Sequence, residues 1–238
     1  MTILQAAAIA ALMTSAVHAD NSSFPEPLAD ALAMTYETPE NAHWRFVLDI
    51  TTGDETLSVR FDGSRPDGED WSLISPADPE TLNEDLSEIW VEMNTPNDAE
   101  QAEGGSSIGT DGLFFDAESA LLVAGGVRSL GSGRYAFTPN LDPGSEEADP
   151  MQEHLSGELS LADAGHVGEI RIFAPESFKP NAAARIHAFE MVMTFDHHDG
   201  LPAPIMTSLS THVEVSALFQ RQQQRMAMRF SDVEYVEP

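Results

Sequence analysis

No cysteine occurs among the 238 residues of this chain. Without thiols the protein forms no disulfide bond, no thiolate metal site and no cysteine nucleophile. Disulfides are common in secreted animal proteins, so an exported chain that lacks them is more typical of a bacterial periplasm. The sequence also has no P-loop and no G-x-G-x-x-G fingerprint, so the common nucleotide-binding motifs are missing as well.

Basic residues are scarce. The chain has 11 Lys and Arg against 40 Asp and Glu, which gives a formal charge of −29, and Lys179 is the only lysine. A surface of this charge repels phosphate groups, which argues against binding of nucleic acid and against adsorption to anionic membranes. The acidity fits a cationic partner, but the simpler interpretation is a surface that keeps the protein soluble in a salty habitat.

Long hydrophobic runs are missing too, since none reaches the roughly 18 residues of a spanning helix, and we expect no stable membrane insertion. The first 19 residues are set apart by composition. The stretch 3–17 is apolar and uncharged, and it ends in Val17-His18-Ala19, an A-x-A-like cleavage pattern. We therefore predict a signal peptide over 1–19, a single mature domain over 20–238 and a periplasmic or secreted location. No Lys or Arg precedes the apolar stretch, so an ordinary N-terminal helix is the alternative.

The first part of the mature chain predicts a hairpin and two helices. Alternating apolar residues from His43 to Thr51 and from Glu55 to Asp62 flank the turn Thr52-Gly53-Asp54, and Trp71 and Leu73 follow in a shorter strand. A short helical pattern covers 27–36. A stronger helix is predicted from Pro79 to Met93, capped by Asp78, with one apolar stripe that consists of Leu82, Leu86, Ile89, Trp90 and Met93.

The middle of the chain is less regular. Residues 97–112 are acidic and glycine-rich and predict a loop, which is a candidate gate. After it, 113–115 predicts a strand and 121–123 a short helix. Residues 134–138 predict a further strand, and 140–150 a second acidic loop.

From about Glu153 to Tyr235 the sequence predicts an antiparallel meander, because apolar and polar residues alternate between short turns. Ile186 and Phe189 are out of phase, which predicts a bulge between them. Residues 175–180 predict a wide connection and 221–225 a polar turn or bulge. The predicted fold class is α+β and β-rich: a curved antiparallel sheet or unclosed β-barrel of about eight to eleven strands, covered by two or three helices.

Few motifs point to catalysis. Gly105-Ser106-Ser107-Ile108-Gly109 fits the G-x-S-x-G pattern, but no buried strand precedes Ser107, so a loop is the better interpretation. Asp196-His197-His198-Asp199 is the densest set of metal-ligand types, and His187 and His212 fall on neighbouring predicted strands. A polar hairpin tip explains the cluster more simply than a metal site. We assign no catalytic residue, no metal and no cofactor.

Methionine and phenylalanine gather in the meander, which contains Met191, Met193, Met206, Met226 and Met228 together with Phe189, Phe195, Phe219 and Phe230. Such side chains form a soft surface that adapts to varied apolar ligands. Most of them are expected to be core residues, and a few are candidates for the wall of a lipid-sized cavity.

The order of elements resembles the periplasmic lipoprotein carrier superfamily of outer-membrane lipoprotein-sorting proteins. The resemblance rests on the export signal, the hairpin that begins Trp44-Arg45-Phe46, the lone amphipathic helix, the segment Arg134-Tyr135-Ala136-Phe137-Thr138-Pro139 and the meander with Phe178-Lys179-Pro180. It implies an unclosed barrel that holds acyl chains in an apolar cavity beneath a helical lid. Arg45 is a loose candidate for the functional arginine of these carriers. The residues predicted to line the cavity are Trp44, Phe46, Leu86, Trp90, Phe189, Met191, Met193 and Phe195.

Three functions follow as hypotheses. The preferred one is a periplasmic binding protein, without enzymatic activity, for a lipid, an acyl chain or another apolar small molecule, with a lipoprotein as a further candidate partner. The second is a secreted hydrolase that uses carboxylates or a histidine-based metal site at His197 and His198. The third is an envelope module that binds other proteins through sheet edges and acidic loops.

Overall fold

A computed structural model describes residues 24–35, 43–66, 69–95, 113–115, 120, 122–140, 151–181, 184–217 and 220–236 of the chain. In these residues the fold is one eleven-stranded antiparallel sheet that does not close into a barrel, with two α-helices. This confirms the predicted fold class. The predicted signal peptide and the 97–112 loop lie outside the described residues.

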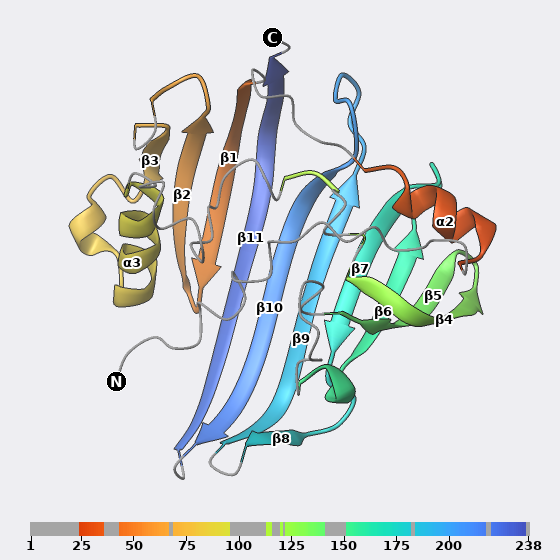
Figure 1. Cartoon of the computed structure of the whole chain (residues 1–238). Helices are drawn as coiled ribbons and strands as arrows, with labels where there is room; N and C mark the ends of the chain where they lie inside the picture. The colour runs from red at the N-terminus through yellow and green to blue at the C-terminus, as the bar shows by residue number, and fades with distance from the viewer. Residues whose placement is uncertain are drawn as a thin grey trace.

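The strands lie in the order β3-β2-β1-β11-β10-β9-β7-β6-β5-β4, and β8 pairs with β9 beside this path (Figure 1). The C-terminal strand thus returns to the N-terminal hairpin and lies between β1 and β10. The strand bounds are β1 His43–Thr52, β2 Glu55–Asp62, β3 Trp71–Ser75, β4 Val123–Gly131, β5 Arg134–Pro139, β6 Ser156–Leu161, β7 Val167–Phe173, β8 Phe178–Asn181, β9 Ala184–Asp196, β10 Ile205–Ala217 and β11 Gln220–Val236.

The predicted N-terminal hairpin is confirmed. Strands β1 and β2 pair without interruption from Arg45↔Asp62 to Thr52↔Glu55, and β3 follows on β2. Gly53 takes a φ of 60° in the turn, a left-handed conformation that glycine adopts without steric cost.

Both predicted helices exist, but they are shorter than predicted. Helix α2 covers Glu26–Leu32. The helix predicted from Pro79 to Met93 is divided in two, because Leu82 is extended, with a ψ of 145°. Asp78 caps only the 3-10 helix η2, Pro79–Thr81, and helix α3, Glu84–Met93, begins anew with the Asn83 side chain accepting from the Leu86 amide at 2.9 Å. Each segment therefore has its own N-cap.

Three local predictions are wrong. The residue Val123, predicted in a helix, begins strand β4, and the predicted connection 175–180 contains the start of β8. The polar stretch 221–225, predicted as a turn or bulge, is part of β11 and pairs with β10 without a register shift. By contrast, 113–115 does pair as predicted, as a single bridge of Phe114 with Ile205 at the start of β10.

The long strands carry the predicted bulge. The pairing of β9 with β10 shifts between Ala188 and Ile186, so His187 is the extra residue. A second irregularity in β11 has Asp232 at a φ of 52° and puts Val233 and Tyr235 on the same face as Phe230. Bulges of this kind increase the twist of a sheet locally.

The sheet has one apolar and one polar face, as the alternation predicts. Two clusters of buried side chains lie on the apolar face. The α3 core joins α3 to β1–β3 and includes Trp44, Phe46, Leu57, Trp71 and Leu86. The α2 core joins α2 to β4–β9 and includes Leu28, Leu32, Ile170, Met191 and Met193.

Candidate apolar binding surface

Between the two cores, strands β9, β10 and β11 present apolar side chains that are only partly buried. We call this the central strip, and it consists of Phe189, Leu209, Val213, Val215, Met226 and Met228. The register sets Phe189 opposite Val213, and Leu209 opposite Met228, so these side chains form one continuous surface across three strands. Val213 belongs to neither core, which marks the centre of the strip.

The helices flank this strip. In Figure 1, α3 lies over β2 and β3 at one end of the sheet and α2 lies over the β4–β7 end, while neither lies over the middle of β10 and β11. The described helices therefore cover the two ends of the apolar face and do not cover its centre.

Residues 113–115 join the two cores above the strip. The Met206 amide donates to the Leu113 carbonyl at 2.6 Å, and the Phe115 amide donates to the Pro204 carbonyl at 3.4 Å. Phe114 packs in the α3 core, with its ring 4.5 Å from that of Trp44, whereas Phe115 packs in the α2 core against Phe195 at 5.4 Å. This short segment therefore connects the two cores across the upper part of the apolar face.

A hollow of about 450 Å³ opens where β10 and β11 separate. Their pairing ends at Ser208↔Arg229, although both strands continue beyond it. The upper hollow, as we call it, has an apolar part made by Leu201, Ile205, Phe230 and Val233 and a polar rim made by His198, Thr207, Arg229, Ser231 and Asp232. Phe230 packs against both cores and so connects the hollow with the central strip.

Arg229 gives the rim a cation. Its side chain projects on the polar face, is exposed and has no hydrogen bond or ion pair with any other described side chain. Sequence reasoning missed this residue, because a single arginine in an alternating strand has no distinctive motif. The sequence did contain one indication. Arg229 directly precedes Phe230, and neighbouring residues of a strand project on opposite faces, so this part of β11 presents a cation on one face and an aromatic ring on the other.

The eight predicted lining residues fall into two separate groups. Trp44, Phe46 and Leu86 are at most 1% exposed in the α3 core, and Trp90 packs against them half-buried. Met191, Met193 and Phe195 are buried in the α2 core. Of the eight, only Phe189 belongs to the central strip. The structure therefore brings these residues onto one face but not into one cavity wall.

Trp44 is an unusual core residue because of its indole N–H group. Its ring is fully buried and stacks on Tyr235 at 4.2 Å, yet its indole Nε1 has no hydrogen-bond partner in the described structure. A buried donor without an acceptor costs free energy, and a buried Trp N–H normally finds a partner. The indole is thus an unused donor at the α3 side of the apolar face.

Arg45, the loose candidate for a carrier-like arginine, does not face this surface. It lies on the polar face and its Nε donates to Asp62 Oδ1 at 3.2 Å. The Ser64 hydroxyl donates to the same oxygen at 2.6 Å, and these hydrogen bonds lower the pKa of Asp62 to about 2. Arg45 therefore links β1 to the end of β2 in the first hairpin.

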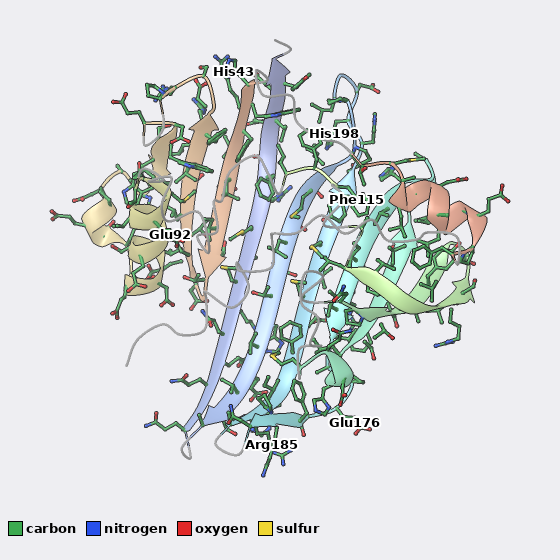
Figure 2. The ribbon with its side chains drawn as sticks, viewed as in Figure 1. His43, Glu92, Phe115, Glu176, Arg185 and His198 are labelled. Atoms are coloured by element: carbon green, nitrogen blue, oxygen red, sulfur yellow. The ribbon has the colours of Figure 1, made fainter. Side chains whose placement is uncertain are left out.

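The described histidines lie on several different elements of the fold. Figure 2 shows His198 at the upper end of the sheet, near the β9–β10 turn. The ring of His197 lies 6.5 Å from that of His166, and His187 bonds to Ser216 at 2.9 Å. No group of three or more His, Asp or Glu side chains converges within the parts of the chain that the structure describes. Ser107 lies outside these parts.

Comparison with protein-family models, with curated proteins and with solved structures finds no match to this chain. Within the described ranges, no helix is long and apolar enough to cross a membrane. A function is therefore inferred from the apolar face of the sheet and the upper hollow.

Proposed function

We propose that this protein binds a lipid acyl chain, or another elongated apolar molecule, along the central strip and in the upper hollow. The observation that carries the proposal is the continuity of the two: Phe230 joins a hollow of about 450 Å³ to a strip of half-buried side chains. A volume of this size falls in the range of about 300–1,000 Å³ that is usual for small-molecule sites.

The chemistry of the lining supports an apolar chain rather than a polar substrate. Met226 and Met228 are flexible and polarizable, so they adapt to ligands of varied shape. Burial of each methylene group of an acyl chain contributes about 0.8 kcal/mol, which makes even a partial fit favourable. Arg229 at the rim supplies a cation for a carboxylate or phosphate head group.

The compartment and the partner are part of the same proposal. The predicted signal peptide and the resemblance to lipoprotein carriers favour a periplasmic or secreted binding protein that moves lipids, or the acyl chains of a lipoprotein, through the envelope. Expression with its leader in a Gram-negative host tests the first step: the mature protein should begin at Asp20 and be recovered from the periplasm. A full-length cytoplasmic product would contradict it.

Ligand binding is tested by native mass spectrometry of the gently purified protein and by titration with the fluorescent fatty acid cis-parinaric acid. We expect co-purified lipid and saturable fluorescence. Val213→Arg puts a charge at the centre of the strip and should weaken the probe's affinity by about tenfold or more, equal to about 1.4 kcal/mol.

The matched control is Val192→Arg. Val192 is also a half-buried valine, but it lies on the polar face of β9, opposite Ser210. It should leave probe binding unchanged, while the Tm of both variants shows whether the fold is retained. Equal binding by both variants, or a purified protein without lipid that does not bind the probe, would overturn the proposal.

A further inference from the structure

The β10–β11 hairpin is less acidic than the rest of the chain. Up to Ser231 it contains one acidic residue, Glu214, against three arginines, Arg221, Arg225 and Arg229, while Asp232 and Glu234 lie in the upper part of β11. The whole protein carries a formal charge of −29. The three arginines are four residues apart, and because side chains alternate along a strand, all of them project on the polar face.

Among the strands that the structure describes, only β10 pairs with the lower third of β11, so the other side of this stretch is a sheet edge. Strand β1 pairs with β11 only from Thr52↔Met226 to His43↔Val236, whereas β10 pairs with β11 as far as Ala217↔Gln220. All six residues from Gln220 to Arg225 are exposed, and Figure 1 shows β11 running well past the end of β1. Every second residue of this stretch directs its N–H and C=O away from β10, so an added strand of about 20 Å would find main-chain partners there.

The side chains of this edge are set for an anionic neighbour. Arg221 bonds to Glu214, the acidic residue of β10, and this pairing raises the pKa of Arg221 while it lowers the pKa of Glu214. With its carboxamide oxygen turned toward them, Gln223 accepts from the Arg225 guanidinium at 3.0 Å and from His212 Nε2 at 2.8 Å. Arg225 therefore has no carboxylate partner among the residues that the structure describes.

A hollow of about 290 Å³ lies at the upper end of the free edge, where β1 turns away. Its walls include Thr51 and Gly53 from the β1–β2 turn, Ser210 and His212 from β10, and Arg225 from β11. A carboxylate in this hollow would lie near one guanidinium, one imidazole and the hydroxyl-bearing residues Thr51, Ser210 and Thr211. The only acidic side chain in the lining, Glu190, is already bonded to Arg171 at 2.7 Å.

We propose that an extended acidic peptide adds to this edge as a twelfth strand, with carboxylates at alternate positions facing Arg221 and Arg225 and its end in the hollow. The edge from Gln220 to Arg225 contains no residue of the central strip, and Arg221 and Arg225 lie on the opposite face; the two sites share only Met226, in the lining of the hollow. Peptides that add to sheet edges gain affinity from main-chain hydrogen bonds and specificity from alternate side chains.

Self-pairing and protection from aggregation account for the edge less well. A second copy of the chain, paired antiparallel about Gln223, would put Arg221 opposite Arg225 of its partner, and like charges directly opposite are unfavourable. Charged residues also protect edges from aggregation, but any charge serves that purpose. In a chain with 40 acids, an edge of arginine and glutamine with no acid at all is not explained by protection alone.

Fluorescence polarisation tests the proposal with a labelled eight-residue peptide of alternating Glu and Thr, and with a Lys–Thr peptide as the opposite charge. The Glu–Thr peptide should bind and the Lys–Thr peptide should not. Arg221→Glu/Arg225→Glu should weaken binding by about tenfold or more, and the milder Arg221→Gln/Arg225→Gln by less. Hydrogen exchange should show new protection of the amides from Gln220 to Arg225 when the peptide binds.

The matched control is Arg60→Glu/Arg128→Glu. It makes the same change of charge at two exposed arginines that have no ion pair with another described residue and lie away from the edge, on β2 and β4. Binding of the Glu–Thr peptide should persist in it. The proposal is overturned by absence of binding, by equal loss in both double variants, by binding without protection of 220–225, or by self-association of the protein through this edge.

Discussion

Aromatic rings touch one another throughout the α3 core, whereas in the α2 core they contact at separate places among aliphatic and methionine side chains. Phe46 alone has the rings of Phe61, Trp71 and Phe230 at 5.0, 5.7 and 5.6 Å. In the α2 core, Phe115 meets Phe195, and Met191, Met193 and Met206 fill much of the remaining space. Ring pairs have preferred geometries, while methionine adapts to its surroundings.

One sheet can thus be both fixed and adaptable. The ring contacts hold the first hairpin and β11 at the α3 end in a defined arrangement, and we infer that the methionines let the α2 end readjust. A ligand in the central strip would contact both ends, so we expect the side chains on the α2 side to adjust to it.

The largest effect is expected for Phe46→Ala in the α3 core. Removal of a ring that is 1% exposed and touches three others should lower the free energy of unfolding by about 3–5 kcal/mol. Urea unfolding followed by tryptophan fluorescence measures it, because all three tryptophans, Trp44, Trp71 and Trp90, belong to or pack against this core. A loss below about 1 kcal/mol would show that the aromatic network does not hold this end.

A smaller effect is expected for Gly157→Ala in the α2 core. A Cβ at this position would lie 2.3 Å from Cζ of Phe137, so the ring has to move. Overpacking of this kind typically costs about 1–3 kcal/mol. If the α2 core adapts as we infer, the loss should fall at the lower end of that range and should shrink further in Gly157→Ala/Phe137→Leu. A loss as large as that of Phe46→Ala would remove the distinction between the two cores.

Sequence alone predicted the elements whose pattern is strong. The first hairpin, the meander, the bulge near His187 and the apolar stripe of α3 all follow from periodicity, because burial on one face imposes it. The prediction for 221–225 was wrong because this periodicity is missing there. Both faces of this stretch are exposed, so Arg221-Gln222-Gln223-Gln224-Arg225 carries no alternation and looks like a turn.

The sequence did not predict two features of the fold: the pairing of β1 with β11 and the division of the apolar face into two cores. Trp44 and Tyr235 are 191 positions apart in the sequence, and no local pattern indicates that they stack. Of the candidate site, the residue types were predicted, but Trp44 and Met193 proved to belong to different cores. The upper hollow depends on where β10 and β11 separate, which is a matter of register and not of composition.

The smallest effect is expected from pH, and it should appear at the α3 end. The pKa of Asp62 is lowered from its ordinary value of 3.8 to about 2, first by the Ser64 hydroxyl and further by Arg45. A depressed folded-state pKa stabilises the fold above the unfolded value, and this stabilisation is lost as the pH falls through about 2. Asp62→Asn should therefore lower stability at pH 7, and its difference from the wild type should vanish between about pH 4 and pH 2. Urea melts at several pH values, followed by tryptophan fluorescence, measure this. Ser64→Ala, which removes the main cause of the shift, should move the acid loss to higher pH, whereas an unchanged acid profile would show that the Asp62 contacts do not stabilise this end of the sheet.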